Sequence, residues 1–206
     1  MLFAVTGGIG AGKTTVLRYF AEMGCAAADA DEISHSLTYP GSPVCQTIVQ
    51  RWGQDFLTPE GALDRKRVAK KVFADETERR WLEQQLHPEI GRRILALAQE
   101  ATASGKPLLC AVPLLYETGW DKDFTAVISV WCPPEIQKAR LLGRGWSEEE
   151  CTRRCQAQLS MDEKCERADY VIQSDCSWEM LAEQCRETLA LMAETYGFSL
   201  PNLRKE

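Results

Sequence analysis

A glycine-rich segment near the N-terminus has the spacing of a phosphate-binding loop. It reads Gly7-Gly8-Ile9-Gly10-Ala11-Gly12-Lys13-Thr14 and matches the pattern G-x-x-x-x-G-K-S/T at every specified position. Glycines allow positive φ and a close approach of backbone N–H groups to phosphate oxygens, and a following helix adds its positive N-terminal end. A plain glycine-rich turn is the disfavoured alternative, because an apolar run precedes the segment and a helical pattern follows it.

Side chains in this loop have separate predicted tasks. Lys13 can reach the β- and γ-phosphates of a nucleoside triphosphate, and the Thr14 hydroxyl is a suitable ligand for Mg²⁺. Thr15 would support the α-phosphate side. The nucleotide-binding residues are therefore expected to be Gly8, Ile9, Gly10, Ala11, Gly12, Lys13, Thr14 and Thr15. The expected cofactors are ATP and Mg²⁺.

Two carboxylates follow the next apolar run, residues 25–28, which we expect to be a buried strand. Asp29 and Asp31 would then lie at the carboxyl edge of a parallel sheet, close to the γ-phosphate. A carboxylate there can accept a proton from an acceptor hydroxyl, although positioning and charge neutralisation supply most of the acceleration in phosphoryl transfer. The alternative is that both aspartates cap a helix that begins near Glu32.

Two arginines, Arg140 and Arg144, lie one helical turn apart, just before a second helix start capped by Ser147. On a mobile lid, their guanidinium groups would stabilise charge on the transferring phosphoryl group and exclude water. Ordinary salt bridges at the surface are the alternative.

The rest of the chain alternates apolar runs with helical patterns. Strands are expected at residues 2–6, 25–28, 108–112, 126–131 and 170–172, and helices at 13–23 and after Ser177. Residues 32–100 are mostly helical in pattern, with breakers at 40–41, 59–61 and Pro88. This order predicts an α/β fold with a doubly wound parallel sheet, whose ligands lie at the carboxyl ends of the strands.

Composition excludes several classes of protein. A formal net charge of -6 disfavours nucleic acid as a partner, and no apolar stretch is long enough for a membrane span. The chain begins without a basic leader, so a cytoplasmic protein is expected. The nine cysteines are an odd number without C-x-x-C pairs, which indicates reduced thiols rather than disulfides or a metal site. The single asparagine, Asn202, cannot supply the Asn-Lys-x-Asp element of a GTPase.

Taken together, residues 6–15 and Asp29-Ala30-Asp31 resemble the dephospho-CoA kinase family. Further matches are Gly61-x-Leu63-Asp64-Arg65, His87-Pro88, Val112-Pro113-Leu114-Leu115-Tyr116-Glu117, Gln137-x-x-Arg140 with Arg144, Gln158, and Ala168-Asp169-Tyr170-Val171-Ile172. The resemblance extends to about residue 175. It implies a P-loop kinase that transfers the ATP γ-phosphate to the ribose 3'-hydroxyl of 3'-dephospho-CoA, giving CoA and ADP in the last step of coenzyme A biosynthesis.

The resemblance also implies roles for individual residues. Catalysis is expected to involve Asp31 as general base together with Lys13 and Arg140, and Arg144 is a second lid residue at the nucleotide. The expected substrate-binding residues are Asp29, Arg65, His87, Pro113 and Leu114. His87 is equally compatible with a structural histidine before a helix-starting proline, and the apolar residues with core packing. Glu117 is not expected to be catalytic.

A single domain in three parts is expected. Its nucleotide-binding core comprises about residues 1–31, 105–137 and 155–206, its helical acceptor-binding insertion about 32–104, and its lid about 138–154. One departure concerns the family's asparagine after the Ala-Asp-x-Val-Ile element, where this chain has Gln173-Ser174-Asp175. Serine lacks the paired amide donor and acceptor, so contacts on the adenine side are expected to differ.

Two other functions stay open on the residues alone. One is a different nucleoside or nucleotide kinase with the same loop and lid arginines. The other is a nucleotide-dependent binding switch, which the lid arginines and Asp31 disfavour. The expected partners are the small molecules ATP and dephospho-CoA, with no nucleic acid and no membrane. A monomer is the default, and an oligomer is compatible with the sequence.

Overall fold

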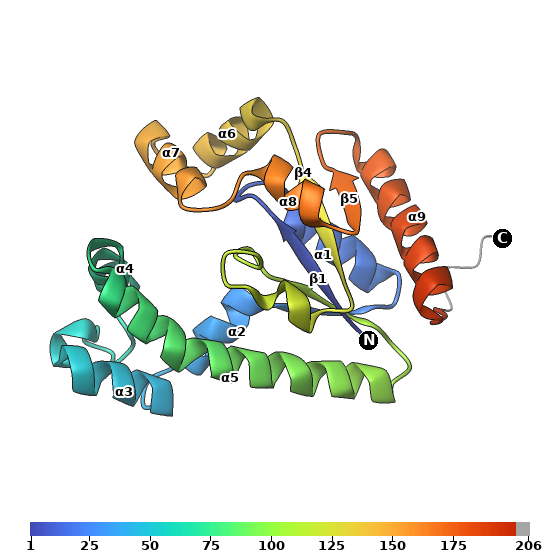
Figure 1. Ribbon diagram of the computed structural model, residues 1–206. Helices are drawn as coiled ribbons and strands as arrows, with labels where there is room; N and C mark the ends of the chain where they lie inside the picture. Colours follow the sequence, from blue (N-terminus) through green and yellow to red (C-terminus); the bar gives the residue numbers. More distant parts are fainter. Residues whose placement is uncertain (201–206) are drawn as a thin grey trace. The chain divides into compact units, whose positions relative to one another are not determined.

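A computed structural model describes residues 1–200 of the chain (Figure 1). Asn202, named above, lies outside this range. The chain divides into two compact units, one formed by Met1–Asp29 with Leu97–Glu206 and the other by Ala30–Ala96. We describe each unit by itself.

The first unit is built on a five-stranded sheet in which every neighbouring pair is parallel, in the order β2-β3-β1-β4-β5. The strands are β1 (Leu2–Gly7), β2 (Ala26–Asp29), β3 (Leu108–Ala111), β4 (Ala126–Trp131) and β5 (Tyr170–Gln173). Strand β1 is buried along its whole length, because it lies between two neighbours and helices cover both faces of such a sheet. The predicted α/β class with a parallel sheet is confirmed.

Register between the strands places the phosphate loop at the carboxyl edge of the sheet. Val5 pairs with Ala111 of β3 on one side and with Ile128 of β4 on the other, and Gly7 pairs with Val130. The chain order reverses between β3 and β4 around β1, so β1 ends at the topological switch point where ligands of open α/β sheets bind.

Helices of the first unit pack their apolar stripes on this sheet. They are α1 (Lys13–Glu22), α6 (Pro134–Gly143), α7 (Glu148–Gln156), α8 (Met161–Arg167) and α9 (Trp178–Tyr196), with a short 3-10 helix at Trp120–Asp123. Helix α1 buries Val16, Leu17 and Phe20, and Figure 1 shows it beside the long C-terminal helix α9. The shared core contains Phe3, and each Å² of apolar surface that it removes from water contributes about 25 cal/mol to stability.

The second unit is helical. Its elements are α2 (Ala30–Leu37), α3 (Pro43–Trp52), a 3-10 turn at Gln54–Phe56, α4 (Arg65–Ala74) and the part of α5 (Glu76–Ala103) up to Ala96. Helix α3 begins at a serine cap, because the Ser42 hydroxyl accepts the Cys45 N–H at 3.1 Å, and Asp64 caps α4 in the same way. A small core of Val44, Cys45, Ile48 and Leu63 holds this unit together.

One local expectation was wrong. Pro88 does not break a helix but lies inside the 28-residue α5. An interior proline costs about 3 kcal/mol or more, and the burial of Ile90 and Ile94 in the next two turns opposes that cost. Helix α2 begins at Ala30, directly after β2 and two residues before Glu32. An isolated antiparallel bridge pairs Leu57 with Leu63, and the structure has no strand within residues 32–100.

The nine cysteines all carry free thiols. Burial raises the pKa of Cys25, of Cys110 and of Cys185 to about 12, so these three thiols stay protonated and unreactive at neutral pH. Among the described residues no helix combines the length and the apolar character that crossing a membrane requires.

Candidate active site

The glycine-rich loop joins the end of β1 to the start of α1 and bends in a way that only glycine allows. Gly7, Gly10 and Gly12 have φ of 138, 78 and 105. A Cβ on Gly7 would lie 2.4 Å from the Val130 carbonyl oxygen, so a side chain there is excluded. The Gly12 cap of α1 offers no side-chain hydrogen bond, which leaves the start of this helix for an anion.

The Lys13 side chain folds back along the loop. Its Nζ donates to the carbonyl oxygens of Gly7 and Gly8, each at 2.9 Å. Thr14 is exposed in the first turn of α1, and Thr15 is half-buried beside it. The loop therefore presents a positive charge, a hydroxyl and a run of backbone amides, which together suit a polyphosphate and its Mg²⁺.

Helix α6 is fastened to the same loop by two side chains that lie one turn apart. Gln137 Nε2 donates to the Ile9 carbonyl at 2.7 Å. The Arg140 guanidinium donates through Nη1 to the carbonyls of Gly10 at 3.4 Å and Ala11 at 3.3 Å. The Nη1 group of Arg140 is thus committed to the loop backbone.

Ser174, directly after β5, completes this contact. Arg140 Nη1 donates to Ser174 Oγ at 2.8 Å and Nη2 donates to the Ser174 carbonyl. The Ser174 hydroxyl in turn donates to the Ala11 carbonyl, and its side chain is buried. The residue at the position of the expected asparagine therefore ties the arginine to the phosphate loop. Sequence reasoning flagged the position but did not foresee these bonds.

Arg144 has a different environment. It is the C-terminal cap residue of α6 and is exposed, and its backbone N–H donates to the Leu141 carbonyl at 3.1 Å. Of the two arginines, Arg140 contacts the phosphate loop in the part of the chain that the structure describes. Arg144 at the nucleotide stays a prediction.

The two aspartates fall on either side of the boundary between the units. Asp29 is the last residue of β2 and pairs in register with Ala111, and it is half-buried. Asp31 is exposed in the first turn of α2, in the helical unit. Because the helix already begins at Ala30, Asp31 is not the cap residue that the alternative interpretation required. A carboxylate in a first turn is still favourable toward the helix dipole.

Arg65 and His87 both lie in the helical unit. Arg65 is the first residue of α4, and its Nη2 donates to Thr38 Oγ1 at 3.1 Å and to the His35 carbonyl at 3.5 Å. His87 is half-buried in the middle of α5, where burial lowers its pKa from 6.5 against an opposing effect of Glu83. His87 lies inside α5, so Pro88 does not start a helix as the structural explanation expected. The substrate contacts predicted for both residues stay predictions.

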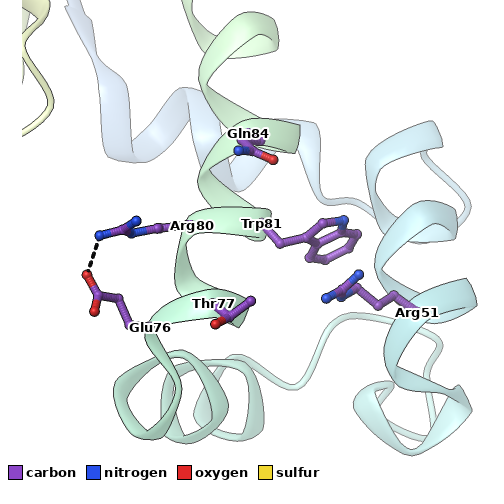
Figure 2. A pocket seen from close by; sticks show the side chains of 6 residues that line it. All are labelled: Arg51, Glu76, Thr77, Arg80, Trp81 and Gln84. Carbon is purple, nitrogen blue, oxygen red and sulfur yellow. Dashed lines mark hydrogen bonds and ion pairs between the residues drawn. The ribbon is translucent and has the colours of Figure 1, made fainter.

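The helical unit also contains a pocket of about 410 Å³ (Figure 2). It is lined by Arg51, Glu76, Thr77, Arg80, Trp81 and Gln84, none of which the sequence had suggested. Arg51 lies over the Trp81 ring at 4.7 Å and pairs with Glu78 at 2.8 Å, and Arg80 pairs with Glu76 at 2.8 Å. Both guanidinium groups that line the pocket therefore pair with carboxylates of the same unit.

The segment after β3 carries the apolar residues expected at the acceptor. Leu114 is 42 % exposed and Pro113 is half-buried, whereas Leu115 is fully buried. The neighbouring Glu117 pairs with Lys164 of α8, whose side chain is completely buried. Lys164 was missed by sequence reasoning. The only available signal was its helical spacing from Met161, which places the two residues on one face of α8.

No cluster of three or more His, Cys, Asp or Glu side chains suited to a metal ion is found within residues 1–200. A Mg²⁺ ion carried by the nucleotide needs no such cluster, because phosphate oxygens, water and one hydroxyl such as that of Thr14 supply its ligands.

A parallel sheet with a phosphate loop between its first strand and first helix, and an arginine held against that loop, defines the chain as a P-loop kinase by fold. A shikimate kinase from Acinetobacter baumannii shares the fold, with a TM-score of 0.53 at 18% identity over 94% of this chain and 93% of that one. The model of the family described as "Dephospho-CoA kinase" matches residues 1–179. The chain belongs to the dephospho-CoA kinase family.

Comparisons with individual relatives support the same family. The chain is 43% identical over 173 residues to a dephospho-CoA kinase from Symbiobacterium thermophilum, covering 83% of this chain and 72% of the relative. It is 37% identical over 203 residues to one from Anaeromyxobacter dehalogenans, covering 98% and 96%. The solved structure of a dephospho-CoA kinase from Campylobacter jejuni matches with a TM-score of 0.70 at 25% identity, over 95% of this chain and 98% of that one.

Proposed function

We propose that this kinase transfers the γ-phosphate of ATP, with Mg²⁺, to the ribose 3'-hydroxyl of 3'-dephospho-CoA, and releases ADP and CoA. Membership of the dephospho-CoA kinase family supports the acceptor. One geometric observation supports the donor. Lys13 binds the carbonyls at the start of the glycine-rich loop, and Arg140 binds those at its end, so two permanent positive charges flank the amides that would hold a polyphosphate.

On the nucleotide side, the amides of Gly8 to Thr15 hold the phosphates, and Lys13 stays with the β- and γ-phosphates throughout transfer. The Thr14 hydroxyl would hold a Mg²⁺ ion, which would supply charge neutralisation of the polyphosphate. Arg140 stabilises the charge that develops on the transferring group, and Arg144 closes over the nucleotide from the lid. Because phosphoryl transfer has a loose transition state, this neutralisation is the largest contribution of the protein.

On the acceptor side, Asp31 takes the proton of the 3'-hydroxyl. The hydroxyl oxygen forms a bond to the γ-phosphorus as the bond between the γ-phosphorus and the β-γ bridging oxygen breaks. Asp29 helps to orient the ribose. Arg65 and His87 bind polar groups of dephospho-CoA, with His87 as a neutral partner at pH 7 because burial lowers its pKa. Pro113 and Leu114 form an apolar wall, consistent with the exposure of Leu114.

The three-part division belongs to the same proposal. The core of about residues 1–31, 105–137 and 155–206 binds ATP, the insertion of about 32–104 binds the acceptor, and the lid of about 138–154 closes on the nucleotide. We further propose a cytoplasmic monomer whose partners are its two small-molecule substrates.

The proposal is tested by following ADP release with adenosine, AMP, dephospho-CoA or no acceptor, each with ATP and Mg²⁺. We expect turnover with dephospho-CoA to exceed the others by several orders of magnitude, with the phosphate on the 3' oxygen of the product by ³¹P NMR. Equal rates without acceptor would indicate an ATP-driven switch. Faster turnover of adenosine or AMP would indicate a different small-molecule kinase.

A further inference from the structure

Lys164 is a completely buried lysine that no proposed step of the reaction uses. Its side chain is 0 % exposed on α8. Its Nζ donates to the Pro113 carbonyl at 2.6 Å and pairs with Glu117 Oε1 at 2.8 Å. An ammonium group is costly to bury unless it is paired and hydrogen-bonded, and both partners here come from the segment of residues 112–118 that follows β3.

Glu117 binds a second part of the same region. Its Oε1 also accepts the N–H of Leu159 at 2.8 Å, two residues before α8 begins. The Glu117 side chain is 19 % exposed, so it is held between water and the buried lysine. Three hydrogen bonds therefore join residues 113–117 to residues 159–164, two segments that are more than 40 positions apart in the chain.

The first turn of α8 contacts the phosphate loop. A Cβ on Gly8 would lie 2.7 Å from Cγ of Met161, so the methionine side chain packs directly on the loop backbone. Asp162 accepts the indole N–H of Trp131 at 2.7 Å, which anchors the helix to the end of β4. Helix α8 thus contacts the phosphate loop through Met161 and the segment after β3 through Lys164, one turn later.

We propose that Lys164 and Glu117 are positioning residues that hold the segment of residues 112–118, with Pro113 and Leu114 on it, at a fixed distance from the phosphate loop. Neither residue touches the reacting atoms. The inference rests on the proposed function, because that function makes Pro113 and Leu114 the wall for the acceptor. In-line transfer requires the acceptor oxygen and the γ-phosphorus to be aligned, and a displacement of about 1 Å costs on the order of 100-fold in rate.

A buried ion pair is weak evidence for stability, since apolar residues of similar volume stabilise a core equally well or better. The pair instead fixes the position of one segment relative to the other. The Lys164 ammonium binds one particular carbonyl and one particular carboxylate, whereas an apolar contact would allow the segment to slide. Burial lowers the pKa of Lys164, and the hydrogen bond and charge of Glu117 oppose that shift.

The test uses Glu117→Gln, Lys164→Met and the double variant, with Glu166→Gln as the matched control on the exposed side of α8. Glu117→Gln keeps an oxygen acceptor for Leu159, and the double variant leaves no charge buried without a partner. We measure kcat, KM for dephospho-CoA, the Kd for ATP by calorimetry, and the Tm of each protein.

We expect all three variants to lose about tenfold or more in kcat/KM for dephospho-CoA, with the Kd for ATP within about twofold of wild type. Glu117→Gln loses thermal stability because the buried Lys164 ammonium is left without its carboxylate, and the double variant recovers that stability without recovering activity. The Glu166→Gln protein behaves as wild type. A double variant with wild-type kinetics, or a loss of ATP affinity that parallels the loss of acceptor turnover, overturns the inference.

Hydrogen–deuterium exchange separates this inference from the proposed function. In the double variant, amides of residues 112–118 should exchange faster while those of α1 are unchanged, whatever the acceptor is. If wild type makes no CoA, the proposed function fails and the exchange result still stands. If exchange at residues 112–118 is the same in wild type and the double variant, the positioning role fails even where CoA is made.

Discussion

Arg140 binds Ser174 through two hydrogen bonds, from Nη1 to the hydroxyl at 2.8 Å and from Nη2 to the backbone carbonyl. The same hydroxyl donates to the Ala11 carbonyl of the phosphate loop. A residue beyond the last strand therefore orients the cation that we place at the transferring phosphoryl group. Because the serine is buried, water does not compete effectively for these bonds.

Replacing Ser174 by alanine removes one acceptor from Arg140 and one donor to Ala11, and keeps the backbone carbonyl. We expect a loss of about 1 kcal/mol of stability and a several-fold fall in kcat, since the guanidinium is less well held. Thermal denaturation and steady-state kinetics measure both. Ser104→Ala is the control, because its hydroxyl bonds to Glu100 at the exposed end of α5. Wild-type kcat in Ser174→Ala would show that Arg140 is oriented without the hydroxyl.

Replacing Arg140 by lysine preserves the charge and removes the planar fork that reaches Gly10, Ala11 and Ser174 at once. We expect kcat to fall on the order of 100-fold, with a smaller change in ATP affinity, if the guanidinium acts mainly in the transition state. Arg186→Lys on α9, whose partner is Glu183, should match wild type. An Arg140→Lys enzyme with normal kcat would place this residue outside the reaction.

Replacing Asp31 by asparagine removes the proposed base without changing the shape of the side chain. Turnover should fall by about 100-fold or more while the Kd for ATP stays near wild type, because the carboxylate acts on the acceptor hydroxyl. Glu32→Gln, at the next position of the same first turn, is the control. Unchanged turnover in Asp31→Asn would remove Asp31 as base and leave Asp29 as the next candidate.

The lowered pKa of His87 predicts that the stability of the protein depends on pH. Burial lowers its pKa below 6.5, so the unfolded chain binds a proton more readily than the folded one at mildly acidic pH. The stability that neutral His87 contributes is complete above pH 6.5 and is lost as the pH falls through the lower, folded-state pKa. His87→Gln should therefore show a smaller fall in Tm between neutral and acidic pH. Parallel curves for the two proteins would contradict the shift.

The local sequence pattern was sufficient to predict the phosphate loop and the sheet. The loop is specified by the spacing of its glycines and Lys13 within eight residues, and the strands by short apolar runs between breakers, so neither depends on distant contacts. The α/β class and the family could be predicted for that reason. Strand ends shifted by at most one residue, as at β2, where the strand is Ala26–Asp29.

Other expectations failed where tertiary packing overrides local preference. Pro88 is a breaker by its chemistry, yet α5 continues through it because Ile90 and Ile94 are buried beyond it. The exposed Arg144 and the loop-bound Arg140 have the same chemistry and neighbouring positions, and nothing local distinguishes them. Their environments differ because α6 ends at Gly143.

By itself, the sequence determined the phosphate loop, the parallel sheet behind it and the family, because these follow from short-range spacing and apolar periodicity. Only the tertiary structure decided that Ser174 orients Arg140 and that Lys164 is buried against Glu117 and Pro113. Arg140 and Ser174 lie 34 residues apart in the chain, and Lys164 and Pro113 lie 51 residues apart. Burial and hydrogen-bond partners at such separations arise from packing, which no local pattern encodes.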